Sequence, residues 1–333
     1  MHRVKRAEKK TDFQSAKNFY PKTKLGISID LQNLEVKETA NTFYRTEEIQ
    51  REQPRNTINM SLPEKITSLQ NPKVKNLKKL EKASERREQN LILIEGLRET
   101  VLAQRAGFVI TALFICEEIL KEDETYNLQT LSKASSGISI YHISKEVYDS
   151  VAYRETTEGV IAIAQPIKHD LAKMKPGKNP LILVIEGVEK PGNLGAMLRT
   201  CDAAGVDAVI ICDGKTDIYN PNVIRSSLGT VFTQQVIVCE TPEAIDYLKK
   251  NGIKIFAAEL EAPNIYFSEK FKQPSAVVVG TEATGLSKAW IEAADARVKI
   301  PMQGQIDSLN VSVSAAVLLF EAVRQRRTKK SGR

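Results

Sequence analysis

Short apolar runs and helical patterns alternate along the second half of the chain. The runs LILVIEG, AVIIC, QVIVC, IKIFAAE, SAVVVG and ARVKIP are almost continuously apolar, and the helical patterns between them include residues 193–204, 242–251 and 287–294. Apolar strands joined by helices are typical of a parallel sheet that is covered on both faces. The pattern therefore predicts an α/β domain over residues 180–327, with its ligands in the loops that follow the strands.

Residues 61–165 show a second, smaller pattern of the same kind. A basic amphipathic helix over about residues 71–89 precedes the strand LILIEG, a helix over 97–106 and the strand VITALFI, and the apolar run GVIAIAQ ends the segment. This alternation predicts a layered α/β domain of ordinary size. The stretch that follows is rich in Lys, Pro and Gly, and it predicts a linker over residues 166–179.

The two ends of the chain have no such pattern. Residues 1–59 are polar and show no sustained period of 2 or 3.6, which predicts a disordered or loosely attached extension. Met60 directly precedes the first helical pattern, so one hypothesis is that translation starts there. A targeting peptide is the alternative, although the acidic residues of this segment are unusual for one. Residues 328–333 are expected to form a basic tail.

Positive charge is concentrated near the ends of the chain. The net charge is +7, and residues 1–60 carry 12 basic and 8 acidic groups, residues 61–90 carry 8 and 4, and residues 321–333 carry 6 and 1. A basic fringe favours contact with a polyanion such as RNA, because each neutralised phosphate releases counterions. The alternative is that the charged ends only keep the protein in solution.

Cysteine and histidine usage argues against a metal site. The chain has three histidines and four cysteines without a CxxC pair, and the cysteines lie far apart, mostly inside apolar runs: Cys116, Cys201, Cys212 and Cys239. Buried, reduced thiols indicate an intracellular, cytoplasmic protein. No run approaches the ~18 apolar residues of a membrane span, so we expect no membrane segment.

Three loops that follow predicted strands combine glycine with polar side chains. They are EGVEKPGNLGAMLRT, VVVGTEATGLS and IPMQGQIDSLN. The first does not fit G-x-G-x-x-G, and the second has Leu286 where a P-loop requires lysine. A dinucleotide-dependent oxidoreductase and a P-loop enzyme are therefore disfavoured. Taken singly, Asn193, Ser308 and Asn310 could be helix caps and Gly285 a turn residue. Three such loops on one sheet instead indicate a single site.

The residues of these loops resemble a known family. NLGAMLRT, GTEATGLS and IPMQGQIDSLNVSVSAA look like the three motifs of the SpoU (TrmH) branch of the SPOUT RNA methyltransferases, N-x-G-x-x-x-R, G-x-E-x-x-G and I-P-M-x-G-x-x-x-S-L-N, in order. The resemblance covers about residues 180–325. The preceding segment resembles the L30e-like RNA-binding domain of many ribosomal RNA members, although TTEGV stands where that family often has T-P-Q-G-V.

The resemblance implies a 2′-O-ribose methyltransferase that uses S-adenosylmethionine, is an obligate homodimer and has a carboxyl-terminal trefoil knot. It implies that the methyl group and the acceptor ribose are surrounded by Asn193, Arg199, Glu282, Ser308 and Asn310. It also implies a set of cofactor-binding residues: Gly280, Gly285, Ile300, Met302 and Leu309. A sulfonium cofactor needs no metal to make its methyl group electrophilic.

The expected substrate is ribosomal RNA of the 23S type, because tRNA-modifying members generally lack the additional amino-terminal domain. Residues expected to contact RNA are Arg225, in NPNVIRSSLGTVF, and Arg86 and Arg87, in ASERREQN. The alternatives are a tRNA 2′-O-methyltransferase and a non-catalytic RNA-binding protein on the same fold. Such a binding protein would have no need of Arg199, Glu282, Ser308 and Asn310 together.

Overall fold

The structure is a computed structural model that describes residues 65–120, 137–153 and 158–327. All of them belong to one compact unit, residues 59–333. The expectations for residues 1–59, for Met60 and for the basic tail at 328–333 lie outside the described residues. The predicted domain boundaries stay predictions.

The second half of the chain forms a seven-stranded sheet in the order β7-β6-β5-β10-β8-β11-β9, and every neighbouring pair is parallel. The parallel sheet predicted from the sequence is therefore confirmed. The strands are β5 (Leu181–Glu186), β6 (Ala208–Cys212), β7 (Val236–Cys239), β8 (Lys254–Ala258), β9 (Asn264–Ile265), β10 (Ser275–Val279) and β11 (Ala296–Lys299). The trefoil knot implied by the resemblance stays a prediction.

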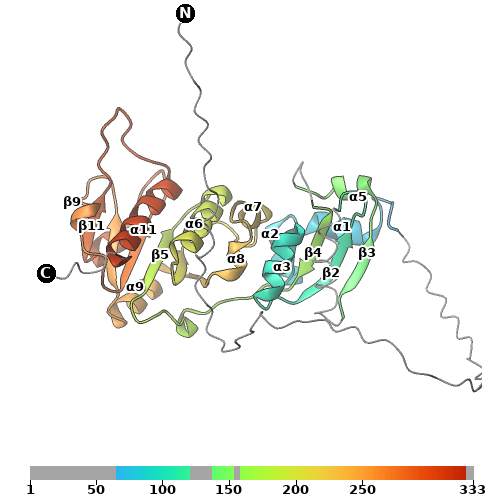
Figure 1. Ribbon diagram of the computed structural model, residues 1–333, viewed down its shortest axis with the longest axis horizontal. Coiled ribbons are helices and arrows are strands. Elements are labelled where there is room, and N and C mark those ends of the chain that lie inside the picture. The colour runs from blue at the N-terminus through green and yellow to red at the C-terminus, as the bar shows by residue number, and fades with distance from the viewer. Residues whose placement is uncertain (1–64, 121–136, 154–157, 328–333) are drawn as a thin grey trace, which may run out of the picture. The chain divides into compact units, whose positions relative to one another are not determined.

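Helices cover both faces of this sheet. Helices α6 (Pro191–Ala204) and α11 (Val311–Arg327) pack side by side on one face, and α9 (Thr241–Lys250) and α10 (Lys288–Ala293) pack on the other (Figure 1). Successive strand residues alternate between the two apolar clusters. Leu183 of β5 belongs to the first cluster and Val184 to the second. Burial on both faces explains why the strands read as unbroken apolar runs.

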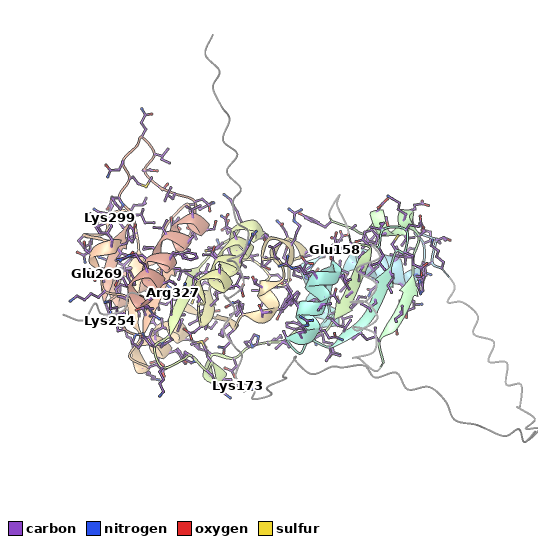
Figure 2. The ribbon with its side chains drawn as sticks, in the orientation of Figure 1. Glu158, Lys173, Lys254, Glu269, Lys299 and Arg327 are labelled. Atoms are coloured by element: carbon purple, nitrogen blue, oxygen red, sulfur yellow. The ribbon has the colours of Figure 1, made fainter. Side chains whose placement is uncertain are left out.

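The first part of the chain forms a four-stranded mixed sheet in the order β1-β4-β2-β3. Its elements are β1 (Ile92–Glu95), α3 (Leu97–Arg105), β2 (Ile110–Ile115), β3 (Ser139–His142), α5 (Lys145–Asp149) and β4 (Val160–Ala164). Helix α3 begins where its sequence pattern predicts. The backbone N–H groups of Leu97 and Arg98 donate to Glu158 Oε2 at 2.7 and 3.1 Å. Glu158, which is labelled in Figure 2, precedes β4, so its carboxylate compensates the positive end of this helix.

The predicted basic helix over residues 71–89 is divided into two helices, α1 (Pro72–Lys79) and α2 (Ala83–Gln89). The break is held by Arg86, whose Nη1 donates to the carbonyl oxygens of Leu80 and Glu81, both at 2.7 Å. The same guanidinium forms an ion pair with Asp217 at 2.6 Å, and the Arg86 side chain is 3% exposed. The expectation that Arg86 contacts RNA is therefore wrong, because its hydrogen-bonding groups are buried in the protein.

An aromatic cluster joins the smaller sheet to the elements beside the larger one. The ring of Phe108, which precedes β2, lies 5.8 Å from Tyr219 and 5.0 Å from Phe232 between ring centroids. Tyr219 precedes α7 (Pro221–Ser226), and Phe232 lies in α8 (Thr230–Thr233). Edge-to-face aromatic pairs add to the free energy gained from apolar burial. No helix among the described ranges is long and apolar enough to cross a membrane.

Removal of the Arg86 guanidinium should destabilise this junction. Arg86→Ala leaves Asp217 without its buried partner and two carbonyl groups without a donor, so we expect the free energy of unfolding to fall by about 3 kcal/mol. Urea denaturation followed by circular dichroism measures this change. Arg87→Ala, at the exposed neighbour, is the matched control and should change it by less than about 0.5 kcal/mol. Equal effects of the two substitutions would contradict the structural role of Arg86.

Candidate active site

The candidate site lies where the carboxyl ends of neighbouring strands meet. Strands β5 and β10 are adjacent in the sheet, and the loops that follow them, residues 187–190 and 280–287, leave the same edge. The loop that follows β11, residues 300–310, returns to this edge before α11 begins. The structure therefore brings together all three loops that the sequence singled out.

The carboxylate of Glu282 is the centre of a polar cluster. Asn193 Nδ2 donates to Glu282 Oε1 at 2.8 Å, and Asn310 Nδ2 donates to the same oxygen at 2.9 Å. Asn310 Nδ2 also lies 3.2 Å from Asn193 Oδ1. One side chain from each of the three motifs is thus in direct contact with the other two, as a single site requires.

The two asparagines have different roles at the starts of their helices. Asn310 Oδ1 accepts hydrogen bonds from the backbone N–H of Ser312 at 3.0 Å and from its hydroxyl at 2.6 Å, so the amide nitrogen of Asn310 points to Glu282. Asn310 therefore caps α11 and joins the site. Asn193 is not a cap, because α6 begins at Pro191 with Lys190 as its N-cap. The side chain of Asn193 is thus available to the carboxylate.

Lys190 completes the cluster, and the sequence did not point to it. Its Nζ donates to Glu282 Oε2 at 2.5 Å. This hydrogen bond is the largest cause that holds the pKa of Glu282 below its usual value, and the hydrogen bond from Asn193 acts in the same direction. Glu282 is therefore an ionised acceptor near neutral pH rather than a proton donor.

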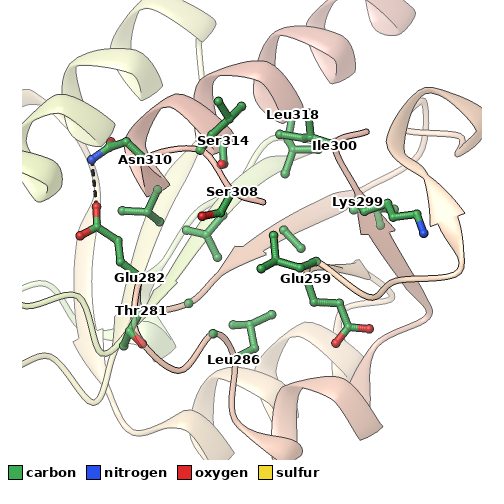
Figure 3. A pocket seen from close by; sticks show the side chains of 18 of the residues that line it. Glu259, Thr281, Glu282, Leu286, Lys299, Ile300, Ser308, Asn310, Ser314 and Leu318 are labelled. Carbon is green, nitrogen blue, oxygen red and sulfur yellow. Dashed lines mark hydrogen bonds between the residues drawn. The ribbon is translucent and has the colours of Figure 1, made fainter. Parts of the chain in front are cut away.

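A cavity of about 650 Å³ adjoins this cluster. Its lining includes Glu282, Ser308 and Asn310. It also includes all five residues expected to bind the cofactor: Gly280, Gly285, Ile300, Met302 and Leu309. Figure 3 shows Glu282 and Asn310 joined at its side, with Leu286, Ile300 and Leu318 around it. The lining combines apolar and polar side chains, and a cavity of this size is typical of those that bind small molecules.

Two glycines shape the wall of this cavity. Thr281 and Gly285 exchange two backbone hydrogen bonds of 3.1 Å, which close a tight turn around Glu282. A Cβ atom on Gly280 would lie 2.3 Å from the carbonyl oxygen of Gly285, and Gly285 has a φ of +67°. Side chains are excluded at the first position by space and disfavoured at the second by backbone conformation. These glycines therefore position the carboxylate without any side chain of their own.

A second cavity of about 440 Å³ lies on the other side of Glu282. Its lining includes Lys190, Asn193 and Lys215, and it shares Thr281 and Glu282 with the first cavity. Lys215 pairs with Glu189 at 2.5 Å. Two cavities thus adjoin at one carboxylate.

The remaining predicted site residues lie elsewhere. Arg199 is exposed on α6 and lines neither cavity, because six residues of an α-helix turn it about 120° away from Asn193. Arg87 is exposed on α2. The guanidinium of Arg225, on α7, lies 5.3 Å from the ring centroid of Tyr153. Within the described ranges, no group of three His, Cys, Asp or Glu side chains is placed to hold a metal ion.

Comparison with known proteins agrees with this arrangement. The SpoU rRNA Methylase family matches residues 180–320, and the MRM3-like substrate binding domain matches residues 71–162. The chain is 34% identical over 255 residues to the 23S rRNA (guanosine(2553)-2′-O)-methyltransferase RlmP of Bacillus subtilis, covering 77% of this chain and 97% of that protein. The chain belongs to the SpoU rRNA methylase family.

Solved structures of this SpoU family share the fold. An RNA 2′-O ribose methyltransferase is 41% identical, with a TM-score of 0.70, over 79% of this chain and 99% of that one. An AdoMet-bound rRNA methyltransferase from Sinorhizobium meliloti is 27% identical, with a TM-score of 0.72, and the match covers 78% of this chain and 97% of that one. The cofactor of this SpoU methylase is S-adenosylmethionine, and the larger cavity fits a ligand of that size.

The pKa of Glu282 gives a test of the polar cluster in this SpoU methylase. Lys190 lowers that pKa, so Lys190→Ala should raise it, and protonation of Glu282 should then begin at a higher pH. We expect the acidic limb of the pH profile of kcat to move to higher pH in this variant. Lys250→Ala removes an ion pair within α9 and is the matched control. An acidic limb that does not move, or that moves to lower pH, would contradict the role of Lys190.

Proposed function

We propose that this protein transfers a methyl group from S-adenosylmethionine to the ribose 2′-hydroxyl of a guanosine in ribosomal RNA of the 23S type. The observation that carries the proposal is the pair of adjoining cavities that share Glu282, one lined by all five expected cofactor residues and the other by Lys190, Asn193 and Lys215. The substrate class is supported by RlmP and by the match of residues 71–162 to a substrate binding domain.

The larger cavity is the proposed cofactor site. When it is bound, S-adenosylmethionine supplies a methyl group on a sulfonium, which is electrophilic without a metal. Gly280, Ile300 and Leu309 contact it chiefly through backbone groups, while Gly285 and Met302 complete the wall. Glu282 lines both cavities, and Asn310, which lines the larger one, donates to it, so the two side chains set the direction from which the ribose approaches.

The smaller cavity is the proposed acceptor site. Asn193 holds the ribose through its amide, and the ionised carboxylate of Glu282 keeps that amide in a fixed orientation. Ser308 lies on the cofactor side, where its hydroxyl donates to Asp307 at 3.0 Å. Lys190 and Lys215 also line this cavity, where they pair with the carboxylates of Glu282 and Glu189, and RNA phosphate would compete with these carboxylates for their ammonium groups.

Arg199 is the proposed electrostatic partner of the reacting hydroxyl. Its guanidinium is always charged, so it stabilises the developing alkoxide or binds an adjacent phosphate and does not act as a base. Because Arg199 lines neither cavity of its own chain, we place it in the active site of a second copy. The exposed apolar side chains Val313 and Phe320, both on α11, support a homodimer through the catalytic domain.

The RNA is proposed to continue from the acceptor cavity across Arg225 and Arg87, with the basic chain ends as further phosphate contacts.

Transfer of tritiated methyl groups to RNA tests the proposed reaction. Wild-type protein should label unmodified transcripts of 23S rRNA, and mapping should place 2′-O-methylation on a guanosine. Arg199→Ala should lower kcat at least about 100-fold, because it removes charge stabilisation of the transition state, while S-adenosylmethionine still binds in calorimetry. Label on tRNA alone would show that the substrate is wrong. Near-normal turnover of the variant would remove Arg199 from the site.

Mixed dimers test whether Arg199 acts across the dimer. Arg199→Ala and Asn310→Ala homodimers should each be inactive. When the two variants are mixed, dissociated and allowed to reassociate at random, the mixture should recover about a quarter of wild-type activity. Half of the dimers are then mixed, and each mixed dimer has one site with both residues intact. A mixture of Arg199→Ala with Arg199→Lys protein is the control for reassociation itself. No recovery in the first mixture would show that Arg199 acts within its own chain.

A further inference from the structure

The last residue of β5, Glu186, is a buried acid in an otherwise apolar strand. It is 7% exposed, and it follows Ile185, which belongs to the apolar cluster on the side of α6 and α11. Because successive strand residues alternate, the side chain of Glu186 lies on the opposite face, which α9 and α10 cover. A carboxyl group is stable in such a place only where it makes hydrogen bonds.

One oxygen of Glu186 contacts the turn that forms a wall of the larger cavity. Glu186 Oε2 accepts a hydrogen bond of 2.7 Å from the backbone N–H of Ser287, the last residue of the loop 280–287. Ser287 is also the N-cap of α10, so this N–H stands where the turn ends and the helix begins. The carboxyl group thus joins the end of the turn to the end of β5.

The other oxygen of Glu186 faces a polar network between α9 and α10. Glu186 Oε1 lies 3.4 Å from the hydroxyl oxygen of Thr241, the first residue of α9. That hydroxyl donates to Asp213 Oδ2 at 2.6 Å and accepts a hydrogen bond of 3.2 Å from Nε1 of the buried Trp290. The surroundings of the carboxyl group are therefore fixed by packed elements on two sides.

The residue between the two fixed points of the turn lines the larger cavity. Thr281 and Gly285 exchange backbone hydrogen bonds at the start of the turn, and Glu186 holds Ser287 at its end. Leu286 lies between these points, and Figure 3 shows it among the side chains around the cavity. A displacement of Ser287 would therefore move Leu286 and change the shape of the proposed cofactor site.

The turn is held from both faces of the sheet. On the side of α6, Asn193 donates to Glu282. On the side of α9 and α10, Glu186 accepts from the end of the turn. Helix α6 is itself packed closely on α7, because a Cβ atom on Gly195 would overlap Ser226 Oγ. A shift of the turn toward either face would break one of these two hydrogen bonds.

We propose that Glu186 is a positioning residue for S-adenosylmethionine, whose carboxyl group accepts the N–H of Ser287 and so holds the turn of residues 280–287 in the conformation that binds the cofactor. Glu186 lines neither of the two cavities that share Glu282, so it acts through the turn and does not touch the cofactor. The proposal rests on the proposed function, because it takes the larger cavity as the cofactor site.

Substitutions of similar size separate this hydrogen bond from packing. Glu186→Met fills the space with a weak acceptor, whereas Glu186→Gln keeps an acceptor oxygen for Ser287. Hydrogen–deuterium exchange of peptides that cover residues 280–290, measured by mass spectrometry without cofactor, should be faster in Glu186→Met than in wild type, and Glu186→Gln should resemble wild type. Equal exchange in all three proteins would overturn the proposal.

Cofactor affinity is the second measurement. Glu186→Met should raise the Kd of S-adenosylmethionine in calorimetry about tenfold, because only a fraction of the molecules then has the turn in its binding conformation. Glu186→Gln should stay within about threefold of wild type. At saturating cofactor, kcat of Glu186→Met should fall less than about twofold, since the reacting groups are unchanged. An unchanged Kd, or a kcat that falls as much as the affinity, would contradict a positioning role.

Asp207→Ala is the matched control at the other end of the same strand. Asp207 Oδ2 accepts a hydrogen bond of 2.8 Å from the backbone N–H of Leu181, the first residue of β5. The control therefore also removes a bond between a carboxylate and the backbone, but it should leave both the Kd of S-adenosylmethionine and the exchange of residues 280–290 as in wild type. A Kd raised as much as in Glu186→Met would show that general loss of stability explains the effect.

The outcomes distinguish the role of Glu186 from the proposed function. Methylation of 23S rRNA by wild-type protein, with unchanged cofactor affinity in Glu186→Met, would remove Glu186 from the mechanism and leave the reaction intact. Weaker cofactor binding in Glu186→Met, without any methyl transfer to RNA by wild-type protein, would support the role of Glu186 and refute the reaction.

Discussion

The site depends on one ionised carboxylate that is shared by three loops. Glu282 lies 89 residues from Asn193 and 28 residues from Asn310 along the chain, and it accepts a hydrogen bond from each of them. Lys190 supplies the opposite charge that keeps the carboxylate ionised. Strands β5 and β10 are neighbours, and the loop of residues 300–310, which follows β11 two strands from β10, returns to the same edge of the sheet. The asparagine amides are thereby oriented before any ligand binds.

The sequence pattern was sufficient for the sheet and for the loops, because burial on two faces leaves apolar runs that are easy to recognise. It failed where a contact spans a large separation. Nothing in ASERREQN shows that Arg86 faces inward, since its partner Asp217 lies 131 residues away. The same holds for Lys190 and Glu282, which are 92 residues apart. The strand β9 has only two residues, which is too short to show an alternation of apolar and polar positions.

The two sheets of the described chain are joined by a shared apolar core. Buried side chains of β1, β2 and β4 belong to the same cluster as those of α6 and α11. The amino-terminal part is therefore packed against the catalytic part. Apolar burial across this boundary therefore stabilises both sheets together.

Gly195 has a consequence for how the first motif should be understood. It stands two residues after Asn193, yet it lines neither of the two cavities, and its missing side chain instead admits Ser226 of α7. A larger residue would push α7 outward and carry Arg225 with it. The glycine in N-x-G-x-x-x-R is therefore required by the close packing of α6 against α7, so this position of the motif has a structural role and not a chemical one.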